Sequence, residues 1–106
     1  MADLSQKDWT ERLEADNNAI VLDVRTQDEV DLGMIPEALH IDIHKGQGFI
    51  DEIEKLDKTK NYFVYCKSGG RSAQACGVMN SLGFVNAYNL LDGFSAWEGE
   101  VVIKEQ

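Results

Sequence analysis

The chain has 106 residues, 43% of them hydrophobic, and a formal net charge of −9 from 10 basic and 19 acidic residues. This length and hydrophobic content suit one core, so we expect residues 1–106 to form a single domain. The excess of negative charge argues against nonspecific binding to nucleic acid or to an anionic membrane surface. We therefore expect neither a nucleic acid nor a membrane as a partner.

The N-terminal segment and the cysteine content bear on location. Residues 1–8 contain neither a basic region nor an apolar stretch, so they do not resemble a signal peptide. No run in the sequence is long and apolar enough to span a bilayer. Two cysteines in a chain without secretory features do not make a disulfide framework. We expect a cytoplasmic monomer.

Apolar runs alternate with helical patterns along the chain, which is typical of strand–helix–strand units and a mostly parallel sheet. Apolar or partly alternating runs predict strands at residues 19–25, 38–43, 61–66 and 85–90. Helical patterns predict helices at residues 5–15, 26–33, 49–56 and 72–82, and a helical turn at 93–97. Thr26 and Glu29 fit a capping box, and Gly83 is expected to follow a helix end as its C′ residue.

Cys66 stands where an apolar strand stops and a cationic, glycine-containing loop begins. In parallel sheets, ligands bind beyond the carboxyl ends of the strands. A loop that enters a helix N-terminus directs consecutive backbone N–H groups toward one point and favours an anion there. Gly69 and Gly70 let the backbone fold back, while Lys67 and Arg71 add positive charge. These surroundings predict that Cys66 is a thiolate nucleophile next to an anion-binding site.

Four segments match, in order and spacing, the motifs of one family. They are CKSGGRSA at 66–73, VLDVR at 21–25, GMIPEA at 33–38 and DGFSAW at 92–97. Together they resemble the single-domain rhodaneses, which are thiosulfate-type sulfurtransferases, over nearly the whole chain. The resemblance implies an α/β domain with a mainly parallel five-stranded sheet and helices on both faces. It also implies that Cys66 is the catalytic residue.

The resemblance and the residues together imply a chemistry without a metal or an organic cofactor. The Cys66 thiolate attacks the outer sulfur of thiosulfate, expels sulfite and becomes a persulfide, which passes its outer sulfur to cyanide or a thiol. The residues expected to bind the anionic donor are Lys67, Ser68, Gly69, Gly70, Arg71 and Ser72. The alternative is a sulfur-relay module that exchanges persulfide with a protein partner and has little thiosulfate turnover.

A cysteine-dependent phosphatase is a weaker alternative. Such enzymes also hold an anion between a strand and a helix, but their loop is one residue longer than the four residues between Cys66 and Arg71. A phosphatase also needs a carboxylic acid that protonates the leaving alcohol, and the sequence does not identify one.

The remaining polar and cysteine positions have structural interpretations. Cys76 is expected to pack in the core, with a disulfide to Cys66 as the less favoured alternative. Asp23 and Arg25 are expected to brace neighbouring loops. The residues that alternate on a short predicted strand, His40, Asp42 and His44, indicate a polar face more than a metal site.

Three positions depart from the family motifs. Met34 and Glu37 replace a histidine and a glycine of one turn, and Asp92 replaces the first glycine of the closing motif. We expect Asp92 to adopt the left-handed conformation that aspartate visits more readily than most residues.

Overall fold

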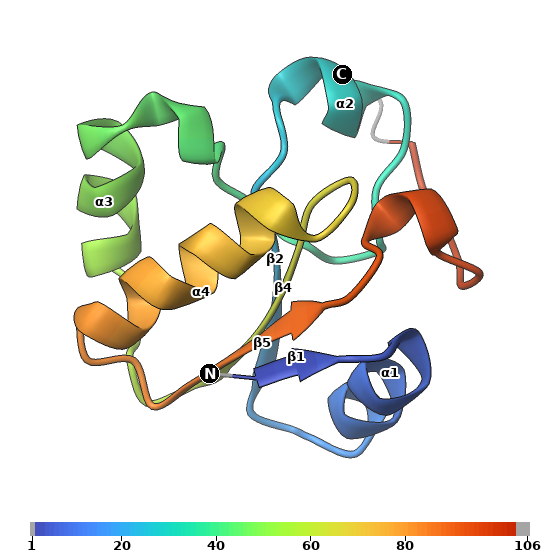
Figure 1. Cartoon of the computed structure of the whole chain (residues 1–106), viewed down its shortest axis with the longest axis horizontal. Helices are drawn as coiled ribbons and strands as arrows, with labels where there is room; N and C mark the ends of the chain where they lie inside the picture. Colours follow the sequence, from blue (N-terminus) through green and yellow to red (C-terminus); the bar gives the residue numbers. More distant parts are fainter. Residues whose placement is uncertain (1, 104–106) are drawn as a thin grey trace.

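The computed structural model describes residues 2–103. Five strands form one sheet in which all neighbouring pairs are parallel. Their spatial order is β1 (Ala2–Leu4), β5 (Asn86–Leu90), β4 (Asn61–Tyr65), β2 (Ala19–Asp23) and β3 (Leu39–His40). The helices are α1 (Gln6–Glu14), α2 (Gln27–Asp31), α3 (Gln47–Glu54) and α4 (Gly70–Ser81), with short 3-10 turns η1 (Ile43–Lys45) and η2 (Phe94–Ala96). Figure 1 shows α3 and α4 on one side of the sheet and α1 on the other. The predicted α/β fold is confirmed.

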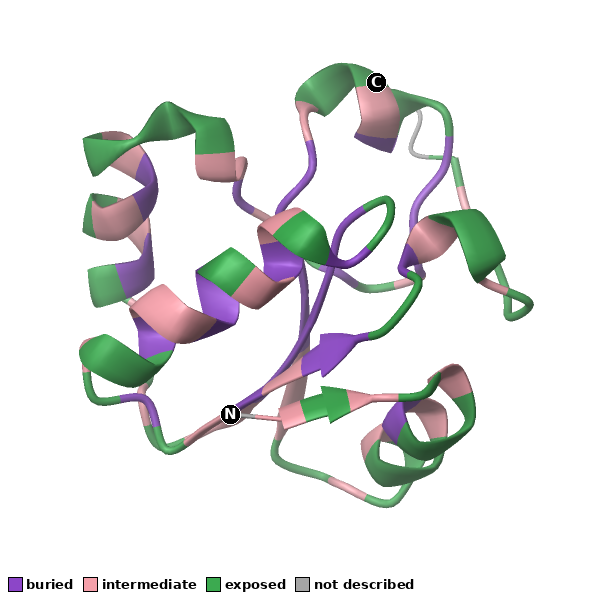
Figure 2. Ribbon diagram, in the orientation of Figure 1, coloured by how far each residue is buried: buried purple, intermediate pink, exposed green. Residues whose placement is uncertain are grey.

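The core lies on both faces of the sheet because side chains of a buried strand alternate between them. Along β4, Tyr62 and Val64 pack with residues of α3 and α4. Phe63 and Tyr65 point to the other face, where they pack with Trp9 of α1. Figure 2 shows the corresponding buried stripes along the sides of α3 and α4 that face the sheet.

The predicted elements agree with the observed ones except at their ends, at the start of the chain and at the predicted strand 38–43. That strand is limited to Leu39–His40, because Asp42 caps a 3-10 turn that takes up Ile43 and His44. The capping box is present, since the Thr26 side chain accepts from the Glu29 amide while the Glu29 carboxylate accepts from the Thr26 amide. Gly83 has φ 93°, as a C′ residue requires. The fifth strand, β1, was not predicted from the residue pattern, because a strand of three residues is too short to show a periodicity. Within residues 2–103, no helix combines the length and apolar character needed to cross a bilayer.

Candidate active site

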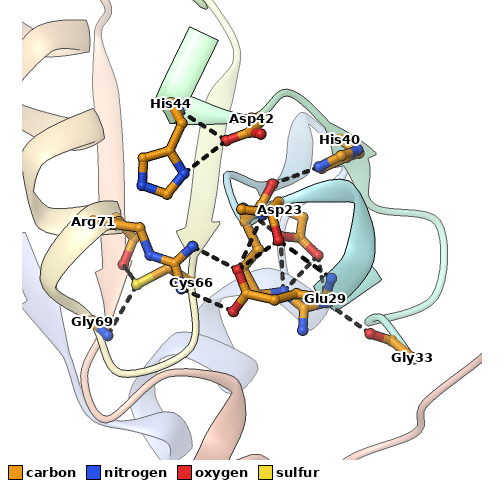
Figure 3. A network of polar contacts seen from close by, with 12 residues as sticks. Asp23, Glu29, Gly33, His40, Asp42, His44, Cys66, Gly69 and Arg71 are labelled. Atoms are coloured by element: carbon orange, nitrogen blue, oxygen red, sulfur yellow. Dashed lines mark hydrogen bonds and ion pairs between the residues drawn. The ribbon is translucent and has the colours of Figure 1, made fainter. Parts of the chain in front are cut away.

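Cys66 is the first residue after β4, and the central position of this strand places it in the middle of the sheet's carboxyl edge. The chain reverses over residues 67–69 and enters α4 at Gly70. The Cys66 residue is completely buried, and its Sγ faces back into this loop. The Gly69 amide lies 3.1 Å from Sγ and the Ser72 hydroxyl 3.4 Å from it (Figure 3). The sulfur is therefore enclosed by donors from the loop and from the first turn of α4.

These donors change the acidity of the thiol. Burial acts to raise the pKa of Cys66, because it removes water from the charged form. Hydrogen bonds from the Ser72 side chain and from the amides of Ser72, Gly69 and Ser68 outweigh burial and lower the pKa below that of an ordinary cysteine. A lowered pKa increases the fraction of thiolate at neutral pH, which is the form that attacks sulfur.

The two loop glycines differ in what they contribute. Gly69 has φ 100°, and a Cβ there would approach the Leu90 carbonyl and the Asp92 amide. Glycine is required at this position because L-residues rarely adopt such a φ. Gly70 is helical, and a Cβ there would meet nothing within 4 Å. The expectation that both glycines let the loop fold back is thus correct for Gly69 and wrong for Gly70.

The two loop cations lie in different surroundings. Lys67 is exposed and has no ion-pair partner among the described residues. Arg71 instead makes a bidentate pair with Glu29 of α2, with N···O distances of 2.7 and 2.9 Å. Hydrogen bonds from Arg71 and Thr26 lower the pKa of Glu29 to about 2, so the pair is ionised at neutral pH. Arg71 therefore joins α4 to α2 and directs one N–H of each terminal nitrogen to a carboxylate.

The segment after β5 holds the other side of the loop. The Phe94 amide donates to the Cys66 carbonyl at 2.8 Å, and the Ser95 amide donates to the Lys67 carbonyl at 2.9 Å. Gly93 lies so close to these carbonyls that a Cβ would come within 2.6 Å of the Cys66 oxygen. Asp92 has φ 64°, which confirms the expected left-handed conformation, and Glu37 has φ 65° where the family motif has glycine.

Asp23 and Arg25 connect the loops that surround the site. The buried Arg25 guanidinium donates to both carboxylate oxygens of Asp23 and, at 2.7 Å, to the Gly33 carbonyl. The Tyr65 hydroxyl also donates to Asp23, and the centroid of the Phe94 ring lies 4.3 Å from the guanidinium carbon of Arg25. Figure 3 shows Asp23 and Gly33 of this network near Glu29. The contacts give Asp23 and Arg25 the bracing role expected of them.

The remaining polar candidates are placed as follows. A ring nitrogen of His40 lies 2.6 Å from the Arg25 carbonyl, so this histidine faces the loop network. Asp42 caps η1 and contacts the backbone and ring of His44. No group of three His, Cys, Asp or Glu side chains within residues 2–103 is arranged to hold a metal ion. Cys76 is buried in the core and free, as expected, and burial raises its pKa to about 12.

Two features of the site were not predicted. A depression of about 250 Å³ beside the loop is lined by Arg25, Glu29, Leu32, Lys67, Phe94 and Ser95. Asn89 of β5 is buried against the loop, where it contacts both Ser72 and Gly69. The strand β5 carries two asparagines, Asn86 and Asn89, and the residue pattern alone does not show which of them is buried.

Comparison with known proteins identifies the class to which this fold and site belong. The protein-family model described as a rhodanese-like domain matches residues 5–100 of this chain. The YtwF protein of Bacillus subtilis is 44% identical over 91 residues, which cover 85% of this chain and 84% of that protein. Thiosulfate sulfurtransferase GlpE of Coxiella burnetii is 35% identical over 79 residues, or 74% of this chain and 71% of that protein.

A solved structure agrees with this family assignment. The rhodanese-like domain protein from Staphylococcus aureus has a TM-score of 0.85 and 27% identity, and the match covers 99% of this chain and 100% of that one. The chain belongs to the rhodanese-like domain family.

Proposed function

We propose that the protein is a rhodanese-type sulfurtransferase that takes sulfur from thiosulfate and carries it as a Cys66 persulfide. The observation that carries this proposal is the enclosure of the Cys66 sulfur by hydrogen-bond donors that lower its pKa. A relative of similar length, GlpE, bears the name of a thiosulfate sulfurtransferase. The acceptor in this proposal is cyanide or a thiol.

Neither step of the reaction needs an external oxidant or reductant, because each new bond to the transferred sulfur forms as an old one breaks. The Cys66 thiolate attacks the outer sulfur of thiosulfate, a new S–S bond forms to Sγ, and the old S–S bond breaks as sulfite leaves with its electron pair. The outer sulfur of the persulfide is then attacked by cyanide, giving thiocyanate and the free thiolate. No proton transfer is required in either step with these substrates.

The loop supplies the positive electrostatic potential for a dianionic donor. Loop amides converge on the sulfur at the N-terminus of α4, whose dipole also favours negative charge. Lys67 adds a full charge at the rim. These groups offset the repulsion between thiolate and thiosulfate and stabilise the charge that develops on the leaving sulfite.

The arrangement of Arg71 favours sulfur transfer over phosphate chemistry. A phosphatase loop needs its arginine to bind the phosphoryl oxygens, whereas both terminal nitrogens of Arg71 donate to Glu29. The amide cradle that remains suits attack at a single sulfur atom. We therefore assign Arg71 the role of fixing the loop against α2.

Steady-state transfer from thiosulfate to cyanide tests the proposed donor. We expect turnover that is proportional to protein concentration, measured as thiocyanate formed. Rapid sulfur loading from a protein persulfide, combined with negligible turnover of thiosulfate, would contradict thiosulfate as the donor and favour the relay alternative.

Replacing Lys67 by alanine is expected to raise the KM for thiosulfate by about five- to tenfold, because the rim loses a full positive charge near the dianion. Use of an uncharged organic persulfide should change less than twofold. Lys55→Ala, which removes an exposed lysine at the end of α3, is the matched control for total charge. Equal losses with both donors would contradict an electrostatic role for Lys67.

A further inference from the structure

Asn89 occupies a position that the sulfur chemistry above does not explain. It lies on β5, is 2% exposed, and is the buried polar side chain of that strand nearest the loop. Its carboxamide contacts three segments: the start of the loop helix at Ser72, the loop at Gly69, and the N-terminal strand at Asp3. A buried amide with all of its groups bonded is held in one orientation.

The contacts of Asn89 fix which end of the amide faces Ser72. The Nδ2 group donates to the Asp3 carboxylate at 2.9 Å and to the Gly69 carbonyl at 3.2 Å. Both partners only accept hydrogen bonds, so they require the NH₂ end on their side. The oxygen Oδ1 consequently faces Ser72 and can only accept from its hydroxyl, at 2.5 Å.

Ser72 therefore has one proton and two neighbouring acceptors. Its hydroxyl bonds to Asn89 Oδ1 and also lies 3.4 Å from Cys66 Sγ. One O–H group can donate fully to only one of them at a time. While Sγ is uncharged, as in the thiol or the inner sulfur of a persulfide, the proton stays with Asn89. When Sγ is a thiolate, donation to sulfur leaves Oδ1 of Asn89 without its partner.

We propose that Asn89 is a positioning residue that competes with the Cys66 thiolate for the proton of Ser72 and so sets how readily the sulfur ionises. The proposal rests on the role of Cys66 as a thiolate nucleophile. Asn89 does not touch Sγ. Its proposed action on the sulfur is through Ser72, and its separate bond to the Gly69 carbonyl is lost equally in both backgrounds of the test below. In this arrangement the bond to Asn89 reduces how strongly the hydroxyl stabilises the empty thiolate.

The charged groups around the thiol are the same in every variant needed for the test. They are Lys67 in the loop, Arg71 on α4 with its partner Glu29 on α2, Asp42 next to η1, and Asp3 on β1. A double-mutant cycle cancels their contributions, and it also cancels any general loosening of the loop that follows the loss of Asn89.

The experiment measures the pH dependence of Cys66 alkylation by iodoacetamide in four proteins: the unchanged chain, Ser72→Ala, Asn89→Ala and the double variant. Mass spectrometry of the Cys66 peptide separates this reaction from any at Cys76. With Ser72 present, Asn89→Ala frees the hydroxyl for the thiolate. The effect of Asn89→Ala on the alkylation midpoint is compared with Ser72 present and with Ser72 replaced by alanine. The midpoint should fall about one pH unit further when Ser72 is present, which is the size of one hydrogen bond to a charged group.

If the fall is larger by more than about 0.3 pH unit with Ser72 present than with Ser72→Ala, the competition is supported. A smaller difference, or one of opposite sign, overturns it. Circular dichroism checks folding, and Asn89→Leu replaces Asn89→Ala if the latter does not fold. A second measurement uses the unchanged asparagine. Its side-chain amide NMR signals should titrate with the Cys66 midpoint, and this titration should be smaller in Ser72→Ala, where only the connection through Gly69 remains; an undiminished titration would overturn the proposal.

The outcome is separable from that of the proposed function. Alkylation requires no sulfur donor, so the cycle can succeed even if thiosulfate fails to load Cys66. Conversely, if thiosulfate turnover is normal but the effects of Ser72→Ala and Asn89→Ala on the midpoint simply add, the sulfurtransferase activity stands and the proposed role of Asn89 is wrong.

Discussion

Replacing Cys66 by serine is expected to lower thiosulfate-to-cyanide turnover by about 10³-fold or more. A serine hydroxyl is not ionised at neutral pH and forms no persulfide, so neither half of the reaction can proceed. The substitution keeps the donors around the position, because the loop amides and Ser72 can bond an oxygen as they bond sulfur. The measurement is thiocyanate formation under saturating thiosulfate.

Cys76→Ala provides the matched control for this variant. Cys76 lies in the core cluster shared with α3, and the loss of its sulfur should change stability more than turnover. Persistent turnover in Cys66→Ser, or an equal loss in Cys76→Ala, would exclude Cys66 as the sulfur carrier.

Replacing Arg25 by alanine is expected to lower the free energy of unfolding by about 3–5 kcal/mol, because it leaves the carboxylate of Asp23 buried without its cation. Asp23 is fully buried and Arg25 is 3% exposed, so water cannot replace the lost partner. The same change removes the hydrogen bond to the Gly33 carbonyl and the contact with Phe94. Urea denaturation followed by fluorescence gives the free energy.

Lys7→Ala is the control for removing an ion pair. Lys7 and Glu11 form an exposed pair on α1, and its loss should cost about 0.5 kcal/mol or less. A loss below about 1 kcal/mol for Arg25→Ala would contradict the view that this buried pair holds the loops around the active site together.

The sequence predicts those parts of the fold that depend on local patterns. Apolar runs located four strands, and the Thr26–Glu29 spacing located the start of α2 because capping is settled within one turn. The nucleophile was also predictable, since Cys66 lies between an apolar strand and a glycine-containing loop. Asp92 was recognised as left-handed from the residue type at a motif glycine.

The features that escaped prediction depend on residues far apart in the chain. Glu29 was recognised as a capping residue, but its pair with Arg71 joins positions separated by 42 residues. Asn89 contacts Asp3, 86 residues away, only because β1 and β5 are neighbours in the sheet. No local pattern encodes such contacts. Sheet order, which sets them, depends on the packing of the whole chain.

The most direct test of sulfur loading at Cys66 is the intact mass of the protein after incubation with thiosulfate. We expect a gain equal to one sulfur atom, mapped to the Cys66 peptide, reversed by cyanide or a reductant and absent in Cys66→Ser. An unchanged mass, or the same gain in Cys66→Ser, would contradict the account.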